Sequence, residues 1–343
     1  MTDSNISNRV AQFLSDQDPQ MAGCEITDYM TVPGGISRIT AGFEVHHENG
    51  SEKLVLRADP PAGTAIIETD RATEWSLLRY LNVETSIPVP RARYFDADGS
   101  QLGSPAIISE FIEGPSLTSV ARAGTEERRR ELSVLVVELA ACVANTSIEG
   151  LPPQLGRPNS WDEYMDTQIA QWAETERLSN GSDPYMRYVG AWLDANRPAP
   201  APLMLVHGDF QTPNILMPAE DEVSLIDWEL THIGDPREDL GWFRLVSMLT
   251  PPDVIGPDGE AFCARYRELT GLTAQVINPA VISYFTVMSS LRVFAGILGG
   301  ATAMDEGQAS STAIAYTALI QSSVHRVWEN IITGLGTKMD SGA

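Results

Sequence analysis

Three oxygen-bearing side chains stand at fixed spacing near the middle of the chain. Asp209 follows a short apolar run, Asn214 comes five residues later, and Asp227 closes a second apolar run eighteen residues after Asp209. Mg²⁺ prefers hard oxygen ligands and keeps water and phosphate in its remaining positions. A nearby carboxylate can take the proton of an attacking hydroxyl. The pattern indicates magnesium-dependent phosphoryl transfer, with Asp209 as the base and Asn214 and Asp227 as metal ligands.

Each of these residues is open to a plainer interpretation. An aspartate after a strand is commonly a turn residue or a helix cap, and the segment that begins at Asn214 can start a helix. Short motifs produce many false matches when they are taken singly. The combination of all three residues at this spacing is therefore what favours chemistry over local structure.

The motif as a whole resembles a known family. The string from His207 to Asn214, H-x-D-x-x-x-x-N, followed by the apolar run that ends at Asp227, resembles the catalytic and metal-binding loops of the protein-kinase-like superfamily. The His-Gly-Asp form is similar to the aminoglycoside phosphotransferase family and its small-molecule kinase relatives. Residues 233–236 and 239–242 are similar to the branch associated with acyl-CoA dehydrogenases.

This resemblance implies an α+β, two-lobed, protein-kinase-like fold. Residues 1–112 would form a nucleotide-binding lobe around a small antiparallel sheet, and residues 113–343 a mainly helical lobe that binds the acceptor. It also makes His207 an organiser of the catalytic loop and Asp239 an acceptor for nearby backbone groups.

The same resemblance assigns nucleotide contacts in the first lobe. Ser37 and Thr40 follow the Gly34-Gly35 turn and would contact the phosphates, while backbone groups of Glu110 and Ile112 would meet the adenine edge.

A cation is expected at the end of the third strand, where the family places a lysine. The strand ends at Arg57, and Lys53 lies at its other end. We choose Arg57, because its planar guanidinium stays charged and suits phosphate and carboxylate together. Glu74, seventeen residues later on a helix predicted over 67–82, is the expected partner, with Glu68 as a rival.

Periodicity places the remaining elements. Val10, Phe13 and Leu14 predict a short amphipathic helix, and the chain beyond residue 114 is mainly helical. The apolar stretch 281–298 contains Arg292, so a buried helix is expected there and not a membrane span.

The composition of the chain argues against some classes of binding partner. The 343 residues carry a net charge of −23, which opposes binding to nucleic acid and to anionic membranes. Three widely separated cysteines and a polar N-terminus favour a reduced, cytoplasmic protein.

The predicted activity is transfer of the γ-phosphoryl group of ATP, or of GTP, to a hydroxyl of a small molecule, with Mg²⁺. The acceptor is either an aminoglycoside-like polycation, which the acidic composition favours, or a hydroxyacyl-CoA thioester, which the branch motifs favour. The alternative is a nucleotide-binding pseudokinase or regulatory scaffold without turnover. The intact set of Asp209, Asn214 and Asp227 argues against that alternative.

Overall fold

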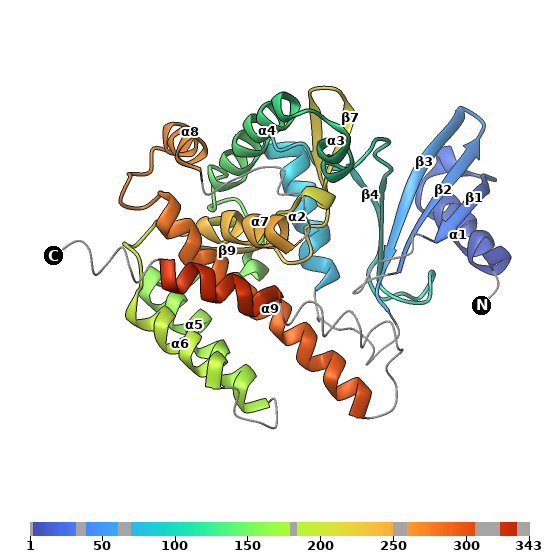
Figure 1. Ribbon diagram of the computed structural model, residues 1–343. Coiled ribbons are helices and arrows are strands. Elements are labelled where there is room, and N and C mark those ends of the chain that lie inside the picture. The colour runs from blue at the N-terminus through green and yellow to red at the C-terminus, as the bar shows by residue number, and fades with distance from the viewer. Residues whose placement is uncertain are drawn as a thin grey trace. The chain divides into compact units, whose positions relative to one another are not determined.

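The computed structural model describes residues 3–31, 39–60, 70–178, 184–249, 259–305 and 323–334, which fall into two compact units (Figure 1). The sheet unit comprises Met1–Gly114, Gly150–Gln154 and Leu216–Glu229. The helical unit comprises Pro115–Glu149, Leu155–Ile215 and Leu230–Ala343. The segment Leu216–Glu229 therefore packs with strands that precede it by more than a hundred residues.

The sheet unit is built on a five-stranded antiparallel sheet in the order β1-β2-β3-β5-β4. Its strands and helices are α1 (Asp3–Gln17), β1 (Glu25–Thr31), β2 (Ile39–His47), β3 (Gly50–Ala58), α2 (Arg71–Glu84), β4 (Ala92–Asp96) and β5 (Ala106–Glu110). Strands β7 (Ile215–Ala219) and β8 (Glu222–Leu225) form a separate two-stranded sheet, and a short 3-10 turn, Pro19–Met21, follows α1.

One face of the sheet forms the core of this unit. Alternate residues of β2 and β3 point inward, among them Phe43, Val45 and Leu56, as the two-residue period of a strand requires. Helix α1 lies along β1–β3 (Figure 1) and buries Val10, Phe13 and Leu14 against them. The amphipathic helix predicted from these three residues is confirmed. Each such side chain, when fully buried, stabilises the fold by about 1.5–3 kcal/mol.

The helical unit contains α3 (Leu117–Ala123), α4 (Glu126–Ala144), α5 (Trp161–Leu178), α6 (Pro184–Ala195), α7 (Arg237–Leu249), α8 (Glu260–Thr270) and α9 (Pro279–Asp305). Residues 323–334 are also helical. Strands β6 (Met204–Val206) and β9 (His232–Gly234) form a two-stranded antiparallel ladder, and 3-10 turns occupy Pro153–Leu155 and Thr212–Asn214.

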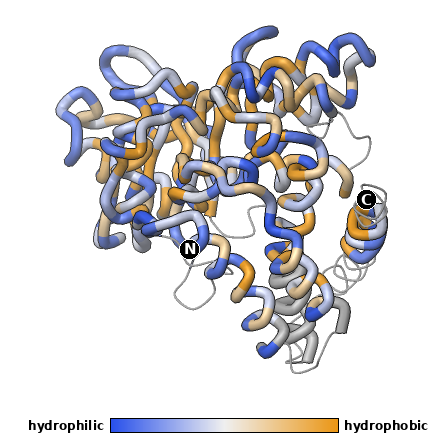
Figure 2. Tube along the Cα trace, turned by 90° about the vertical axis from the view of Figure 1, so that its left-hand side faces the viewer, coloured by the Kyte–Doolittle hydropathy of each residue, from blue (hydrophilic) through white to orange (hydrophobic). Residues whose placement is uncertain are grey.

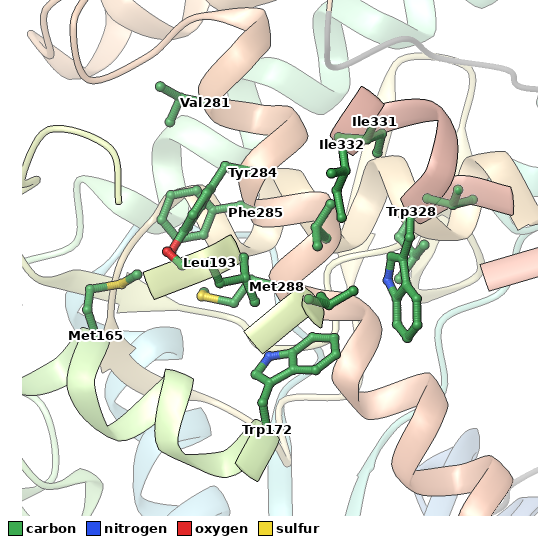
Figure 3. Close-up of a cluster of buried hydrophobic side chains, with 14 of the residues drawn as sticks. Met165, Trp172, Leu193, Val281, Tyr284, Phe285, Met288, Trp328, Ile331 and Ile332 are labelled. Atoms are coloured by element: carbon green, nitrogen blue, oxygen red, sulfur yellow. The ribbon is translucent and has the colours of Figure 1, made fainter. Parts of the chain in front are cut away.

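A cluster of large apolar side chains from α5, α6, α9 and residues 323–334 forms the core of the helical unit (Figure 3). Trp172 and Trp328 meet with their ring centres 5.6 Å apart. The Tyr284 hydroxyl donates to the carbonyl of Leu193 at 2.9 Å, so its buried polar end is satisfied.

A fully buried ion pair lies beside this core. Asp235 and Arg237 are both inaccessible to solvent, with Nη2 2.6 Å from Oδ2 and Nε 2.8 Å from Oδ1. The Trp161 indole N–H donates to Asp235 Oδ2 at 2.7 Å, and Arg237 Nη1 donates to the Ala199 carbonyl at 2.9 Å. Each charge is therefore paired and hydrogen-bonded, which a buried ion pair requires.

Within the described ranges, no helix is long and apolar enough to cross a membrane. Figure 2 shows polar and apolar residues interspersed along the helices. Helix α9 covers the whole apolar stretch 281–298 and carries Arg292 in its interior.

Replacement of Arg237 by methionine should destabilise the helical unit by about 3–5 kcal/mol, because it leaves the Asp235 carboxylate buried and unpaired. Urea unfolding followed by tryptophan fluorescence measures the loss. Arg130→Met is the matched control, since the Arg130–Glu126 pair lies on the exposed face of α4 and should contribute little. Equal losses in the two variants would contradict this account of the buried pair.

Candidate active site

The turn that presents Asp209 follows β6 in the helical unit. Gly208 has φ +85°, and a Cβ atom there would lie 2.2 Å from the carbonyl oxygen of Leu230, so the turn requires glycine. The carboxylate of Asp239, at the start of α7, accepts the backbone N–H groups of His207 at 2.8 Å and of Gly208 at 2.9 Å. The predicted role of Asp239 as a backbone acceptor is confirmed.

Asp239 is only 5% exposed. Burial raises the pKa of its carboxyl group to about 6, although the hydrogen bonds from His207 and Gly208 act in the opposite direction. The charged form, which can accept both N–H groups, is favoured above that pH. His207 also supports the turn, because its Nδ1 accepts the Asp209 N–H at 3.1 Å.

Neutral side-chain donors hold the Asp209 carboxylate. Asn214 Nδ2 donates to Oδ2 at 2.7 Å, Trp242 Nε1 donates to Oδ1 at 2.8 Å, and Gln211 Nε2 lies 2.9 Å from both oxygens. Asn214 also donates to the Asp209 carbonyl at 3.0 Å. Sequence reasoning missed Gln211 and Trp242. Gln211 lies inside the H-x-D-x-x-x-x-N string, but the contact from Trp242 spans 33 residues and has no local signal.

In the sheet unit, Arg57 occupies the end of β3 and is held by three carboxylates. Its Nη1 lies 2.9 Å from Glu74 Oε1, and its Nη2 lies 2.5 Å from Asp227 Oδ1 and 3.4 Å from Glu229 Oε2. Burial by itself lowers the pKa of Arg57, but the nearby carboxylates outweigh burial and raise it. The structure thus joins Arg57, Glu74 and Asp227. Lys53 instead pairs with Glu113, and both side chains are more than half exposed.

A second arginine, Arg71, lies behind this group and was not predicted. It is 3% exposed and contacts Glu74, Asp59 at 3.1 Å and Glu229 at 3.5 Å. Arg57 and Arg71 thus lie among the carboxylates of Asp59, Glu74, Asp227 and Glu229.

A cavity of about 360 Å³ opens beside Arg57 within the sheet unit, in the size range of small-molecule sites. Its walls combine apolar and charged side chains and include Thr40, Val55, Arg57, Glu74, Ile107, Ser109, Glu110, Ile112, Ile226 and Asp227. The structure thus brings Thr40, Arg57, Glu74, Glu110 and Ile112 to one cavity. Ser37 and Glu68 lie outside the described residues.

The backbone after β5 forms one edge of this cavity. The N–H of Glu110 donates to the backbone carbonyl of Arg91 at 2.9 Å, and the N–H of Phe111 donates to the backbone carbonyl of Lys53 at 3.1 Å. The N–H of Ile112 has no protein acceptor among the described residues. It is therefore available to a ligand.

Asp227 adopts a left-handed backbone conformation, with φ +70°. A residue other than glycine pays about 1–3 kcal/mol for such a conformation, which persists where the surroundings impose it and is concentrated at functional sites. Oδ1 of Asp227 accepts from Arg57. In the described part of the chain, Oδ2 has no donor.

The chain belongs to the phosphotransferase enzyme family, whose model matches residues 35–272. It is 30% identical over 227 residues to a probable acyl-CoA dehydrogenase of Arabidopsis thaliana, which covers 61% of this chain but 26% of that protein. The chain thus spans about a quarter of that relative. The resemblance to the aminoglycoside phosphotransferase family and to its acyl-CoA dehydrogenase-associated branch is confirmed.

Solved structures establish the fold. A candidate aminoglycoside phosphotransferase from Ralstonia eutropha superposes with a TM-score of 0.72 at 21% identity, covering 95% of this chain and 98% of that one. A thermostable mutant of aminoglycoside phosphotransferase APH(4)-Ia, in ternary complex with ADP and hygromycin B, gives a TM-score of 0.59 at 15% identity, covering 92% and 98%. The predicted α+β, two-lobed, kinase-like fold is confirmed.

Replacement of Arg57 by alanine should weaken nucleotide binding roughly 10- to 100-fold, since a hydrogen bond to a charged group contributes about 1.5–3 kcal/mol. Glu74→Ala should have a smaller effect, because it loosens Arg57 without removing the cation. Calorimetric titration with ATP and with GTP measures both.

Lys53→Ala is the matched control, because this cation lies on the same strand but pairs at the surface. Thermal unfolding of each variant separates loss of binding from loss of fold. A damaging Lys53→Ala together with a silent Arg57→Ala would overturn the choice of cation.

Proposed function

We propose that this protein transfers the γ-phosphoryl group of ATP or GTP to a hydroxyl of a small molecule, with Mg²⁺. The observation that carries the proposal is the charged group at the cavity of the sheet unit. Arg57 is fixed there by Glu74 and Asp227, in a chain of the phosphotransferase family.

The cavity suits a purine nucleotide. Its apolar walls, with Val55, Ile107 and Ile226, match the faces of a flat ring, and the free Ile112 N–H can donate to a ring nitrogen. The Glu110 carbonyl is the proposed acceptor for an exocyclic amino group. Arg57 would contact the α- and β-phosphates, and Thr40, with Ser37, the phosphates nearest the covering loop.

The chemistry of the available donors fits a magnesium ion. No cluster of three or more His, Cys, Asp or Glu that could hold a metal occurs in the described ranges, so a closed all-protein site is not expected. Mg²⁺ is usually held by one or two protein oxygens with phosphates and water. Oδ2 of Asp227 has no protein donor, and Asn214, which uses Nδ2 for Asp209, keeps Oδ1 without a donor as far as the described chain extends. The bound ion would neutralise phosphate charge.

Asp209 is the proposed general base. The acceptor hydroxyl gives its proton to the Asp209 carboxylate while the hydroxyl oxygen forms a bond to the γ-phosphorus. The bond from that phosphorus to the bridging oxygen breaks, and the nucleoside diphosphate leaves with the electron pair. The protein's work in such a transfer is positioning and charge neutralisation.

Two classes of small molecule are candidates for the acceptor of the phosphoryl group, and a different comparison favours each. A structure of the same fold holds an aminoglycoside, hygromycin B, which favours a polycationic acceptor. The similarity to a protein named as an acyl-CoA dehydrogenase favours a hydroxyacyl-CoA thioester. A coupled assay for ADP or GDP release, run over a panel of both classes, decides between them.

Asp209→Asn tests the base. The substitution keeps the size and one oxygen acceptor, so nucleotide affinity should be unchanged, while turnover should fall about 10²–10⁴-fold. Calorimetry and the release assay are run on the same preparations. Wild-type turnover in the variant would remove Asp209 from the mechanism. A wild-type protein that binds nucleotide but turns over no acceptor of the panel would favour the scaffold alternative.

Asp227→Ala tests the metal ligands. Because it removes a carboxylate from the proposed ion, it should abolish the dependence of nucleotide affinity on Mg²⁺, measured by titration with and without the metal. Asp221→Ala, in the exposed turn between β7 and β8, is the control and should retain that dependence. The same Mg²⁺ dependence in both variants would refute the assignment.

A further inference from the structure

Two side chains of α7 act on the turn that carries Asp209. Asp239 and Trp242 are three residues apart, so they lie on the same face of the helix. Asp239 accepts the N–H groups of His207 and Gly208, and the Trp242 indole N–H donates to Asp209 Oδ1 at 2.8 Å. One helix face thus fixes both the backbone of the turn and the carboxylate that the turn presents.

A third residue holds the same turn from α9. A Cβ atom on Gly241 would lie 2.4 Å from the backbone of Phe285, so the backbones of α7 and α9 approach closely at this point. Arg292 lies seven residues after Phe285, on the same face of α9. Its guanidinium carbon lies 5.2 Å from the centre of the Trp242 ring, and its Nη1 donates to the Gly208 carbonyl.

We propose that Trp242 is a positioning residue for Asp209 and that Arg292 clamps Trp242 in place. The proposal rests on the function proposed for Asp209 above. A carboxylate attached by a single bond rotates, and its orientation decides whether an acceptor hydroxyl meets a lone pair. A cation over the face of an indole ring is attracted to it, so Arg292 restrains the ring that supplies the donor.

Gln211, Asn214 and Trp242 differ in how they are held as donors to Asp209. Gln211 and Asn214 belong to the same loop as Asp209, and Gln211 bridges both carboxylate oxygens. Trp242 instead belongs to a separate helix, α7. A rigid ring anchored in α7 ties the carboxylate to the core, which donors from its own loop cannot do.

The competing interpretation is that Trp242 only fills space, since it also packs against the apolar core of the helical unit. Trp242→Phe separates the two roles. Phenylalanine keeps an aromatic ring for the core and for Arg292, but it has no N–H to donate. A packing role would leave turnover of the folded variant intact, whereas a positioning role would not.

In the coupled release assay, Trp242→Phe should lower kcat roughly 10- to 100-fold, the range found when a hydrogen-bond partner that orients a metal-ligating side chain is removed, with the KM for nucleotide unchanged. Arg292→Met should lower kcat less, because it loosens the ring and keeps the donor. Trp192→Phe is the control, since Trp192 belongs to α6 and packs on Tyr284 in the core of the helical unit. Wild-type kcat in Trp242→Phe would overturn the proposal.

A second measurement does not depend on turnover. The indole N–H resonance of Trp242 is identified by its absence from the ¹⁵N–¹H spectrum of Trp242→Phe. It should move when Asp209 is replaced by asparagine, and its hydrogen exchange with water should quicken in Arg292→Met. An unchanged chemical shift of this resonance in Asp209→Asn would refute the hydrogen bond from Trp242 to Asp209. Absence of turnover in the wild type would refute the proposed function, while this resonance would still decide the positioning role.

Discussion

The buried carboxylate of Asp239 is the group on which the geometry around Asp209 depends. A carboxylate removed from water is costly unless hydrogen bonds replace its hydration, and here two backbone N–H groups, of His207 and Gly208, do so. Gly208 adopts a left-handed conformation, and this conformation lets both N–H groups point at the same carboxylate. The acid, the glycine and the turn therefore require one another. Burial raises the pKa of Asp239 to about 6, so the hydrogen bonds offset the cost of burial only in part.

In the sheet unit the partly buried group is a cation, the guanidinium of Arg57, and carboxylates hold it in place. Arg57 is surrounded by Glu74, Asp227 and Glu229. Arg71 forms ion pairs with two of these carboxylates, those of Glu74 and Glu229. Removal of either arginine would leave buried carboxylates in excess, which is costly. The strained backbone of Asp227 belongs to this network, since its side chain reaches Arg57 from a segment 170 residues further along the chain.

Local patterns made much of this arrangement predictable. The core residues of α1 follow from the helix period, whereas the choice of Arg57 and of its partner Glu74 followed from the resemblance to kinase-like proteins. The H-x-D-x-x-x-x-N string located Asp209 and Asn214. The donors Trp242 and Arg292 could not be found in this way, because their contacts with the Asp209 turn span 33 and 84 residues. They depend on the close approach of α7 and α9 at Gly241, which no period encodes. The lobe boundary at residue 112 stays a prediction, as do the roles of the individual site residues, although Leu216–Glu229 is seen to pack with the sheet.

The contrast between the two polar centres has a chemical reason. The Asp209 carboxylate is held by the amides of Gln211 and Asn214 and the indole of Trp242, all of them neutral donors, and Arg292 binds the neighbouring carbonyl of Gly208. For the base proposed above, a positive charge beside the carboxylate would weaken its affinity for the proton, whereas a neutral donor orients the carboxylate without that effect. Neutral donors fix direction at a smaller cost in basicity. Arg57 is in the converse situation, because its ion pairs with carboxylates favour the charged state of its guanidinium. The formal charge of −23 for the whole chain describes neither centre, because each is governed by the few groups in contact with it.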